Sequence, residues 1–551
     1  MRRTVEGNDS VGEHKGGWNT GVGKAASLLD DAALAHGFAR FVNECPTPFH
    51  AVSWMSERLD AVGFEHLREV DSWQLEAGHA YYVVRNESSL IAFRMGTTEN
   101  LPRFNIAAAH VDSPALRIKP VAELAGPGEY VRLNVEVYGS INERTWLDRP
   151  LSVAGRVLVR ANGRIESRLF APRRDVVIIP SVAIHLNRKI NEEGALNRQI
   201  DLCPLFGAAP DTDAKSANVA AQAVVTASAA VGAPENEAPV GVATPDDRCM
   251  RAASLGMTKT DNVRAAQGLT GVPAQATAPR VRSNGGTNTS PFDAFVAHEL
   301  GVAPEQIVAS DLIVCNRQSA FVWGESGEFV SGPRLDDLLC AYAGFEAMLA
   351  VNNVACDVAC EERTTPVLIC VNNEEVGSTT MQGANSSFVR DVLERIVGAC
   401  DVRQDAMRRA MAQSFVASCD NAQAVHPNHP ELLDQGNRCW LNGGPVIKES
   451  AQQRYATDAV SRAVFEEVCS RAGVPTQVFA TRSDIPCGST IGNMLASSLG
   501  VRTVDVGAAQ LAMHSSYETA GAHDVAHMAR ALASLFVSDI LLGDDGSVAV
   551  A

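Results

Sequence analysis

Residues 367–383, VLICVNNEEVGSTTMQG, lead from an apolar strand pattern directly into two adjacent glutamates. Neighbouring side chains on a strand point to opposite faces. Glu374 and Glu375 can therefore serve one site only if the backbone bends after the strand. We expect a functional site at this strand end, with a separate task for each carboxylate.

Strand and helix patterns alternate on both sides of this stretch. After residue 333 they run as helix 334–351, strand 365–373, helix 386–399, strand 414–422, helix 461–474, strand 503–508 and helix 524–542. Such alternation predicts an α/β layer with a mainly parallel sheet. Toward the N-terminus, a helical pattern over 30–64 precedes two strands within 79–96 and another strand that begins near residue 103.

The middle of the chain has a different character. Residues 118–200 are β-rich, with strand patterns in 129–140, 150–170 and 175–186. Residues 205–291 are rich in Ala, Pro, Ser and Thr, which predicts a disordered or loosely packed insertion; helix in its Ala-rich part is the alternative. Residues 1–28 are polar and Gly-rich, and we expect a flexible arm there.

Composition narrows the class of protein. The 551 residues are 46% hydrophobic and 20% charged, which is typical of a globular protein with more than one domain. A net charge of −17 argues against a nucleic-acid surface. The start of the chain does not resemble a signal peptide and no apolar run is long enough to cross a membrane. The 13 cysteines are scattered along the chain, which indicates reduced thiols and predicts a cytoplasmic protein. We also expect no membrane partner.

Polar residues recur where the predicted strands end. They are His110, Asp112, Asp336, Glu374, Glu375, Asp420 and His514. Ligands of open α/β sheets bind at this edge. Each residue also has a structural explanation, since an Asp at a strand end commonly caps the next helix and adjacent glutamates commonly form a solvated turn.

Taken together, two histidines and several carboxylates form an oxygen and imidazole set that suits zinc or a similar divalent ion. If two ions are bound, one carboxylate must bridge them, and another must stay off the metal to act as a base. Asp112 lies two residues after His110. It is thus on the same strand face, where it can accept the second imidazole N–H.

The chain resembles the aspartyl aminopeptidase family of zinc metallopeptidases. The resemblance rests on ordered motifs that include AAHVDSPALRIKP (108–120), IPSVAIHLNR (179–188), GPRLDDL (332–338), NNEEVGSTTMQGA (372–384), DNAQAVHPNHPE (420–431), GGPVIKESAQQRYATD (443–458), SDIPCGSTIG (483–492) and QLAMHSSYETAG (510–521). It implies an α/β catalytic domain, with a mainly parallel sheet and helices on both faces, that is interrupted by a β-rich dimerisation domain. The catalytic parts would be 29–117 and 330–551, and the dimerisation domain 118–329.

The resemblance also implies roles for single residues. His110, Asp336 and Asp420 would hold one Zn²⁺, and Asp336, Glu375 and His514 the other, with Co²⁺ or Mn²⁺ as possible substitutes. Glu374 would be the general base, and Asp112 the partner of His110. The implied reaction is removal of N-terminal residues, preferably Asp or Glu, from peptides. Family members assemble as dodecamers built from dimers, in which His185 would reach a neighbouring active site.

Binding an acidic side chain requires a cation in the pocket, and Lys448 and Arg454 are the candidates. Surface charge with a structural ion pair is an equal alternative for both. Residues 487–492, CGSTIG, predict a tight turn that opens a helix and can present N–H groups to substrate.

Three departures from the family pattern bear on specificity. Gln423 stands where a histidine is common, Tyr517 stands where an arginine is usual, and KESAQQRY lacks the usual asparagine. None of them is a proposed ligand or base. An aminopeptidase that prefers neutral residues therefore remains the main alternative, and a non-catalytic member that keeps only the assembly is a further one.

Overall fold

The computed structural model describes residues 29–96, 101–192, 194–208, 290–357, 364–400, 403–543 and 547–551, together with Ala25 and Asp545. Of the predicted arm at 1–28, only Ala25 is described. Most of the predicted insertion at 205–291 also lies outside the described residues. The chain divides into two units, the larger of which comprises 1–123, 132–206 and 288–551.

A nine-stranded sheet organises the α/β part of the chain. Its strands, in sheet order, are β1 (Glu65–His66), β2 (Ala80–Arg85), β3 (Ser89–Arg94), β14 (Thr364–Val371), β4 (Arg103–His110), β15 (Phe415–Cys419), β19 (Arg502–Gly507), β17 (Val446–Glu449) and β18 (Gln477–Ala480). The central strands β14, β4, β15 and β19 run parallel, and β3 and β17 join them antiparallel. The sheet is thus mainly parallel, as the sequence predicts.

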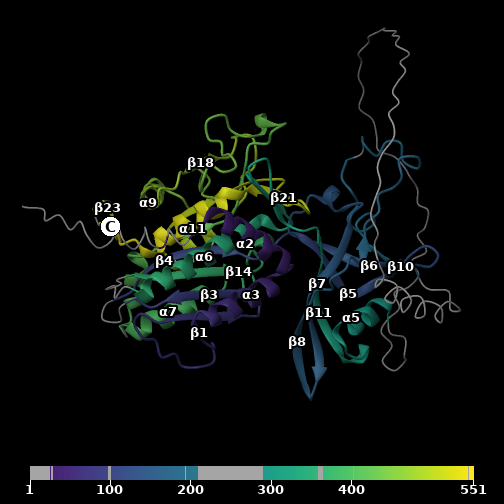
Figure 1. The fold of residues 1–551 in the computed structure, drawn as a ribbon, viewed down its shortest axis with the longest axis horizontal. Helices are drawn as coiled ribbons and strands as arrows, with labels where there is room; N and C mark the ends of the chain where they lie inside the picture. Colours follow the sequence, from purple (N-terminus) through teal and green to yellow (C-terminus); the bar gives the residue numbers. More distant parts are fainter. Residues whose placement is uncertain are drawn as a thin grey trace, which may run out of the picture. The chain divides into compact units, whose positions relative to one another are not determined.

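Helices cover both faces of this sheet (Figure 1). One face carries α2 (Asp31–Glu44), α3 (Pro48–Ala61), α6 (Leu335–Asp357), α9 (Ala459–Arg471) and α11 (Ala522–Val537), and the other carries α7 (Phe388–Cys400), α8 (Ala406–Ala412) and α10 (Gly492–Leu499). Strand β4 shows why two layers form. Ala107 and Ala109 pack into the first layer, whereas Ile106 and Ala108 pack into the second, because side chains alternate along a strand.

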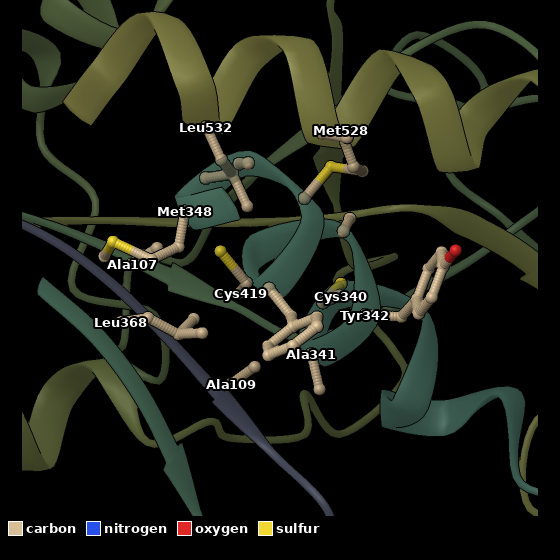
Figure 2. Packing of buried hydrophobic residues seen from close by; sticks show 14 of the residues in the cluster. Ala107, Ala109, Cys340, Ala341, Tyr342, Met348, Leu368, Cys419, Met528 and Leu532 are labelled. Atoms are coloured by element: carbon tan, nitrogen blue, oxygen red, sulfur yellow. The ribbon is translucent and has the colours of Figure 1, made fainter. Parts of the chain in front are cut away.

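The first layer is packed most closely between α11 and α6. In Figure 2, Met528 and Leu532 of α11 point toward Met348 of α6 and toward the sheet residues Ala107 and Leu368. All five side chains are at most 1% exposed. The start of α6, which carries Asp336, is held at the carboxyl ends of the parallel strands by Ser113 Oγ and Asn421 Nδ2, which donate to the Asp336 and Leu335 carbonyls at 2.8 and 3.0 Å.

The β-rich part forms a separate seven-stranded sheet with its own apolar core. The order is β11 (Ile307–Cys315), β5 (Ala115–Ala125), β6 (Tyr130–Tyr138), β10 (Leu205–Ala208), β9 (Val177–Ile178), β7 (Pro150–Ala161) and β8 (Arg164–Phe170). Strand β11 also pairs with β7, so the six strands from β11 to β7 in this order form a closed ring. Helix α5 (Pro291–Leu300) buries Phe292 and Val296 in this core.

Two smaller sheets complete the described residues. One has the order β12 (Phe321–Trp323), β13 (Phe329–Gly332), β21 (Glu518–Gly521), β20 (Ala509–Leu511) and β16 (Ala422–Gln423), and the other pairs β22 (Ile540–Leu542) with β23 (Val548–Val550). Residues 321–332 therefore pair with strands near the C-terminus and not with the seven-stranded sheet. The domain limits 118–329 stay a prediction, and strand pairing favours an end near Cys315.

Three predicted elements differ from the structure, and proline explains two of the differences. The helix expected over 30–64 is two helices, since Pro46 and Pro48 flank Thr47 and interrupt the backbone hydrogen bonds. The strand expected over 175–186 is only Val177–Ile178, because Pro180 has no N–H to donate. The last helix ends at Val537, after which the chain turns into β22.

Leu532→Ala tests the packing between α11 and α6. Removing this fully buried side chain leaves a cavity, and we expect a loss of about 2–5 kcal/mol in the free energy of unfolding, measured by urea denaturation. Leu541→Ala is the matched control, because Leu541 is 46% exposed and its loss should change stability by less than about 0.5 kcal/mol. Equal effects of the two substitutions would contradict this description of the core.

Candidate metal centre

The site lies at the carboxyl edge of the parallel strands. In the register of β14 and β4, Val371 is opposite His110, so both strands end together. The next strand in the sheet, β15, ends at Cys419, directly before Asp420. Glu374 and Glu375 follow β14 after a two-residue step. Parallel topology alone therefore brings residues far apart in sequence to one edge.

Three overlapping groups of side chains can hold a metal ion. They are His110 with Asp336 and Asp420, Asp336 with Glu375 and His514, and His110 with Glu374 and Glu375. The donor atoms within each group lie within 4.8 Å of one another. Asp336 belongs to the first two groups, and its two oxygens face different histidines. Oδ1 lies 3.8 Å from His110 Nε2 and Oδ2 lies 3.2 Å from His514 Nε2.

The donor set fits zinc. Asp336 Oδ1 and Glu375 Oε1 are buried acceptors without a hydrogen-bond partner among the described residues. A buried, unpaired carboxylate oxygen is costly unless a cation or a donor meets it. Carboxylate oxygens next to two imidazoles are the ligands that zinc takes in proteins. The residues thus provide both the ligand chemistry and the need for positive charge.

Burial and crowded negative charge shift the pKa values of the site. Burial raises the pKa of Glu374 to about 7 and also raises those of Asp420 and Glu375. For Asp336, burial favours a higher pKa, but the hydrogen bond to His514 and the charge of His110 lower it below its usual value. Burial favours a low pKa for His514, yet Asp336 and Glu375 raise it to about 10. The site therefore attracts cations strongly.

A tight bend after β14 brings both glutamates to the site. Asn373 and Gly377 flank the single turn Glu374–Val376, and both have left-handed backbones, with φ of 65° and 94°. Asn373 Oδ1 accepts hydrogen bonds from Thr380 Oγ1 and Gln382 Nε2 at 2.9 and 2.6 Å, which holds the bend in place. The bend that the sequence required after the strand is thus present.

Asp112 supports this bend more closely than it supports His110. Its carboxylate accepts hydrogen bonds from the backbone N–H groups of Glu374 and Glu375 at 3.1 and 3.2 Å, and from Tyr138 Oη at 2.6 Å. His110 Nδ1 lies 3.0 Å from the backbone oxygen of Asp112 but 3.5 Å from its carboxylate. The partner of the imidazole is therefore chiefly the carbonyl, which differs from the expected pairing with the carboxylate.

Two further carboxylates in the site were not among the predicted residues. Glu518 accepts hydrogen bonds from the backbone N–H groups of Leu335, Asp336 and His514, at 2.7, 3.2 and 2.6 Å, and burial raises its pKa to about 8. Asp337 is fully buried, and its Oδ2 lies 3.4 Å from the His110 N–H. The sequence did contain a signal for each of them. Glu518 is an acid four residues after His514, and Asp337 is the second Asp of GPRLDDL.

A cavity of about 330 Å³ opens beside the candidate ligands. Lys448 and Gln423 line it, together with Tyr455, Phe479, Ser489, Thr490, Met494 and Met513. Arg454 and His185 are exposed, and neither is among the described residues that line the cavity. Of the two cations proposed for acidic side chains, the structure thus places only Lys448 at the site.

Residues 487–491 lead into α10 as an irregular segment and not as the predicted tight turn, and Ser489 and Thr490 lie in the cavity wall. This segment is held by Asp505 of β19, whose carboxylate accepts hydrogen bonds from Thr490 Oγ1 at 2.5 Å and from the Ala456 N–H at 2.5 Å. Asp505 thereby ties two loops of the cavity to the central sheet.

A mainly parallel α/β sheet with a carboxylate and histidine centre at its edge is an arrangement that can hold a catalytic metal ion. The model of the aminopeptidase I zinc metalloprotease family, M18, matches residues 41–230 and 252–536. The chain belongs to this family, which includes aspartyl aminopeptidase, and it is a metallo-aminopeptidase. The resemblance seen in the sequence is confirmed.

Relatives match along nearly the whole chain. A probable M18 family aminopeptidase 2 from Pseudomonas paraeruginosa is 38% identical over 511 residues, which cover 93% of this chain and 99% of the relative. The solved structure of Ape4 in complex with Nbr1 is 30% identical, with a TM-score of 0.75, and covers 93% of this chain and 86% of that one. The mApe1 dodecamer of S. cerevesiae is 26% identical, with a TM-score of 0.67, over 91% and 96%.

Asp112→Asn tests the support of the bend. An amide offers one acceptor oxygen where the carboxylate uses both, so one of its three donors will face an NH₂ group. We expect zinc affinity to fall about 10–100-fold although Asp112 belongs to none of the three metal-binding groups. Competition with a chelator measures the affinity. Asp484→Asn, at an exposed Asp, is the control, and an unchanged affinity in Asp112→Asn would contradict the assigned role.

Proposed function

We propose that this metallo-aminopeptidase holds two zinc ions per subunit and removes N-terminal residues, preferably Asp or Glu, from peptides. The observation that carries the proposal is the sharing of Asp336 between two groups of ligands, each completed by one histidine and one further carboxylate. His110 and Asp420 complete the first group, and Glu375 and His514 the second. Co²⁺ and Mn²⁺ are substitutes that the same oxygen and nitrogen donors accept.

Bound zinc supplies a lowered pKa for a water molecule and a positive charge for a carbonyl oxygen. Glu374 is the proposed general base. It belongs to neither of the groups that share Asp336, and it lines the cavity. Burial raises the pKa of the metal-free Glu374 carboxyl to about 7, and a carboxylate close to the attacking water can serve as general base. Glu374 therefore takes the proton of the attacking water and passes it to the departing amine.

Glu374→Gln and Glu375→Gln separate the base from the ligand. We expect Glu374→Gln to lower kcat by several orders of magnitude with zinc content unchanged, since a proton-transfer group contributes about 10²–10⁴-fold and the amide also misplaces the water. Glu375→Gln should lower zinc content, because an amide is a weaker ligand. Metal analysis and peptide turnover on the same samples measure both effects. Loss of zinc in Glu374→Gln alone would show that the two roles are reversed.

Lys448 is the proposed contact for an acidic substrate side chain. Its Nζ donates to the backbone oxygens of Asp420 and Asn421 at 2.7 and 3.4 Å, which uses two of its three hydrogens. Burial favours a lower pKa, but the nearby Asp420 raises it, so the ammonium group keeps its charge. A buried, charged group at the cavity wall provides the electrostatic reason for a preference for Asp and Glu.

Lys448→Met and Arg454→Ala form a matched pair for this assignment. We expect Lys448→Met to lower kcat/KM for Asp-p-nitroanilide at least 100-fold more than for Leu-p-nitroanilide, because only the acidic side chain loses a charge-assisted contact. Arg454→Ala should leave the ratio unchanged. A wild-type enzyme that favours Leu would instead support the alternative of a neutral-residue aminopeptidase, and an equal loss for both substrates would assign Lys448 a purely structural role.

The assembly is proposed to be a homo-oligomer, most simply a dodecamer built from dimers; the S. cerevesiae relative is a dodecamer. Exposed apolar side chains support it, since Val182, Ile184 and Leu186 alternate around His185 and are 45–84% exposed. A second copy of the chain would cover them and place His185 near its active site. We further propose residues 29–117 and 330–551 as the catalytic domain and 118–329 as the dimerisation domain, although strand pairing favours an earlier end of the latter, near Cys315.

The location of the protein is proposed to be cytoplasmic. Ten cysteines of the described segments are free thiols, which is compatible with a reducing compartment. Separately, no helix in the described parts of the chain is long and apolar enough to cross a membrane.

A further inference from the structure

A short connection in the β-rich part of the chain reaches the metal centre. It comprises residues 138–142, from the last residue of β6 to the turn Glu143–Trp146. Ile141 and Trp146 are buried in the apolar core of the seven-stranded sheet, which anchors the connection there. None of its residues belongs to the three groups that can hold a metal ion, and it has no part in the proposed peptidase reaction.

This connection holds His514 by both its side chain and its backbone. His514 Nδ1 lies 2.8 Å from the Ser140 backbone oxygen, and the His514 backbone oxygen accepts a hydrogen bond from the Asn142 N–H at 2.9 Å. A carbonyl oxygen can only accept, so Nδ1 carries a proton and Nε2 faces the candidate ligands, 3.2 Å from Asp336 and 3.5 Å from Glu375. A bond of this kind fixes the tautomer and orientation of a metal-binding histidine.

Gly139 lies against a second candidate ligand. Its backbone is left-handed, with φ of 70°, and a Cβ at this position would lie 3.1 Å from Glu375 Cβ and 3.3 Å from Glu375 Oε2. Both separations are shorter than the optimal distance between non-bonded heavy atoms. Only a residue without a side chain therefore lets this backbone approach Glu375 so closely.

Tyr138 supports the bend that carries the glutamates. Its Oη donates to Asp112 Oδ2 at 2.6 Å and accepts a hydrogen bond from Asn373 Nδ2 at 2.9 Å. The same oxygen of Asp112 accepts the hydrogen bond of the Glu375 N–H at 3.2 Å. The Tyr138 hydroxyl thus holds the carboxylate that positions Glu375.

The other group of ligands is held from within the α/β part. His110 Nδ1 lies 3.0 Å from the backbone oxygen of Asp112, the second residue after it. Lys448 Nζ lies 3.7 Å from Asp420 Oδ1 and donates to the Asp420 backbone oxygen at 2.7 Å.

The contacts of residues 138–140 converge on Glu375 and His514. These are the two ligands that the second group does not share with the first. The His514 side chain is also 29% exposed, against 1% for His110, so it depends more on the few contacts that hold it. Loosening the connection should therefore affect one of the two groups.

We propose that Tyr138, Gly139 and Ser140 are positioning residues for one zinc ion, the ion at Glu375 and His514. Binding of the other ion is independent of them. The inference rests on the proposed two-zinc centre. It gives the β-rich part a second role beside the proposed dimerisation, because the connection is anchored in its core.

Gly139→Ala in the full-length protein tests the inference, because the added methyl group must displace Glu375 or the connection. We expect the affinity for one of the two zinc ions to fall at least tenfold and the affinity for the other to stay unchanged. Chelator competition and metal analysis measure both. Gly163→Ala is the matched control. Gly163 lies between β7 and β8 with a similar φ of 75°, and a Cβ there meets nothing within 4 Å, so both ions should bind as in the wild type.

A double variant shows which ion is affected. His514→Ala should leave one zinc ion, at His110 and Asp420. Adding Gly139→Ala to this variant should not change the affinity for the remaining ion, since the connection positions only the site that is already lost. A further loss of affinity would overturn the inference and assign the connection a general structural role.

Tyr138→Phe removes the hydroxyl and keeps the ring, and it decides the question if Gly139→Ala does not fold. The affinity for the same single ion should fall about tenfold. Tyr82→Phe is the matched control, because it removes a hydroxyl that donates to Asp60 at 2.7 Å between β2 and α3, and it should change neither affinity. Two ions of wild-type affinity in the folded variants would overturn the inference and leave the two-zinc proposal intact. A wild type that binds only one ion would overturn the two-zinc proposal itself.

Discussion

The mutual repulsion of buried carboxylates is the constraint on which this structure depends. Asp336, Glu375 and Asp420 lie at one edge of the sheet beside two imidazoles and the Lys448 ammonium group, and two of their oxygens have no hydrogen-bond partner among the described residues. Such an arrangement is stable only with positive charge at its centre. Zinc bound there satisfies the charge balance, and the fold provides the ligands without a dedicated loop, because parallel strands end together.

The centre is held in place mostly through the backbone. Asp112 binds the N–H groups of the two glutamates, and Glu518 binds those of Asp336 and His514. Asp112 thereby fixes the proposed base and one candidate ligand, and Glu518 fixes two candidate ligands. Neither acid belongs to the groups that can hold a metal ion. The left-handed backbone at Asn373 and Gly377 bends the chain after the strand, so that Glu374 and Glu375 can both reach the site. The different roles proposed for these two adjacent glutamates thus depend on the bend.

Much of this arrangement could be predicted from the sequence, because it follows from strand order. The apolar runs before His110, Glu374 and Asp420 are parallel neighbours in the sheet, so their ends had to converge. Glu518 and the contacts of Asp112 could not be predicted in the same way. They bind backbone N–H groups, and such contacts leave no periodic pattern in the chain. Lys448 and Arg454 are only six residues apart, and tertiary burial alone places one at the cavity wall and the other in solvent.

Anomalous diffraction at the zinc edge, from crystals of the zinc-loaded protein, tests the central claim most directly. The account predicts two peaks per chain on either side of the Asp336 carboxylate, with His110 and Asp420 at one, Glu375 and His514 at the other, and Glu374 coordinated to neither. A single peak, or coordination by Glu374 in place of Glu375, would contradict it.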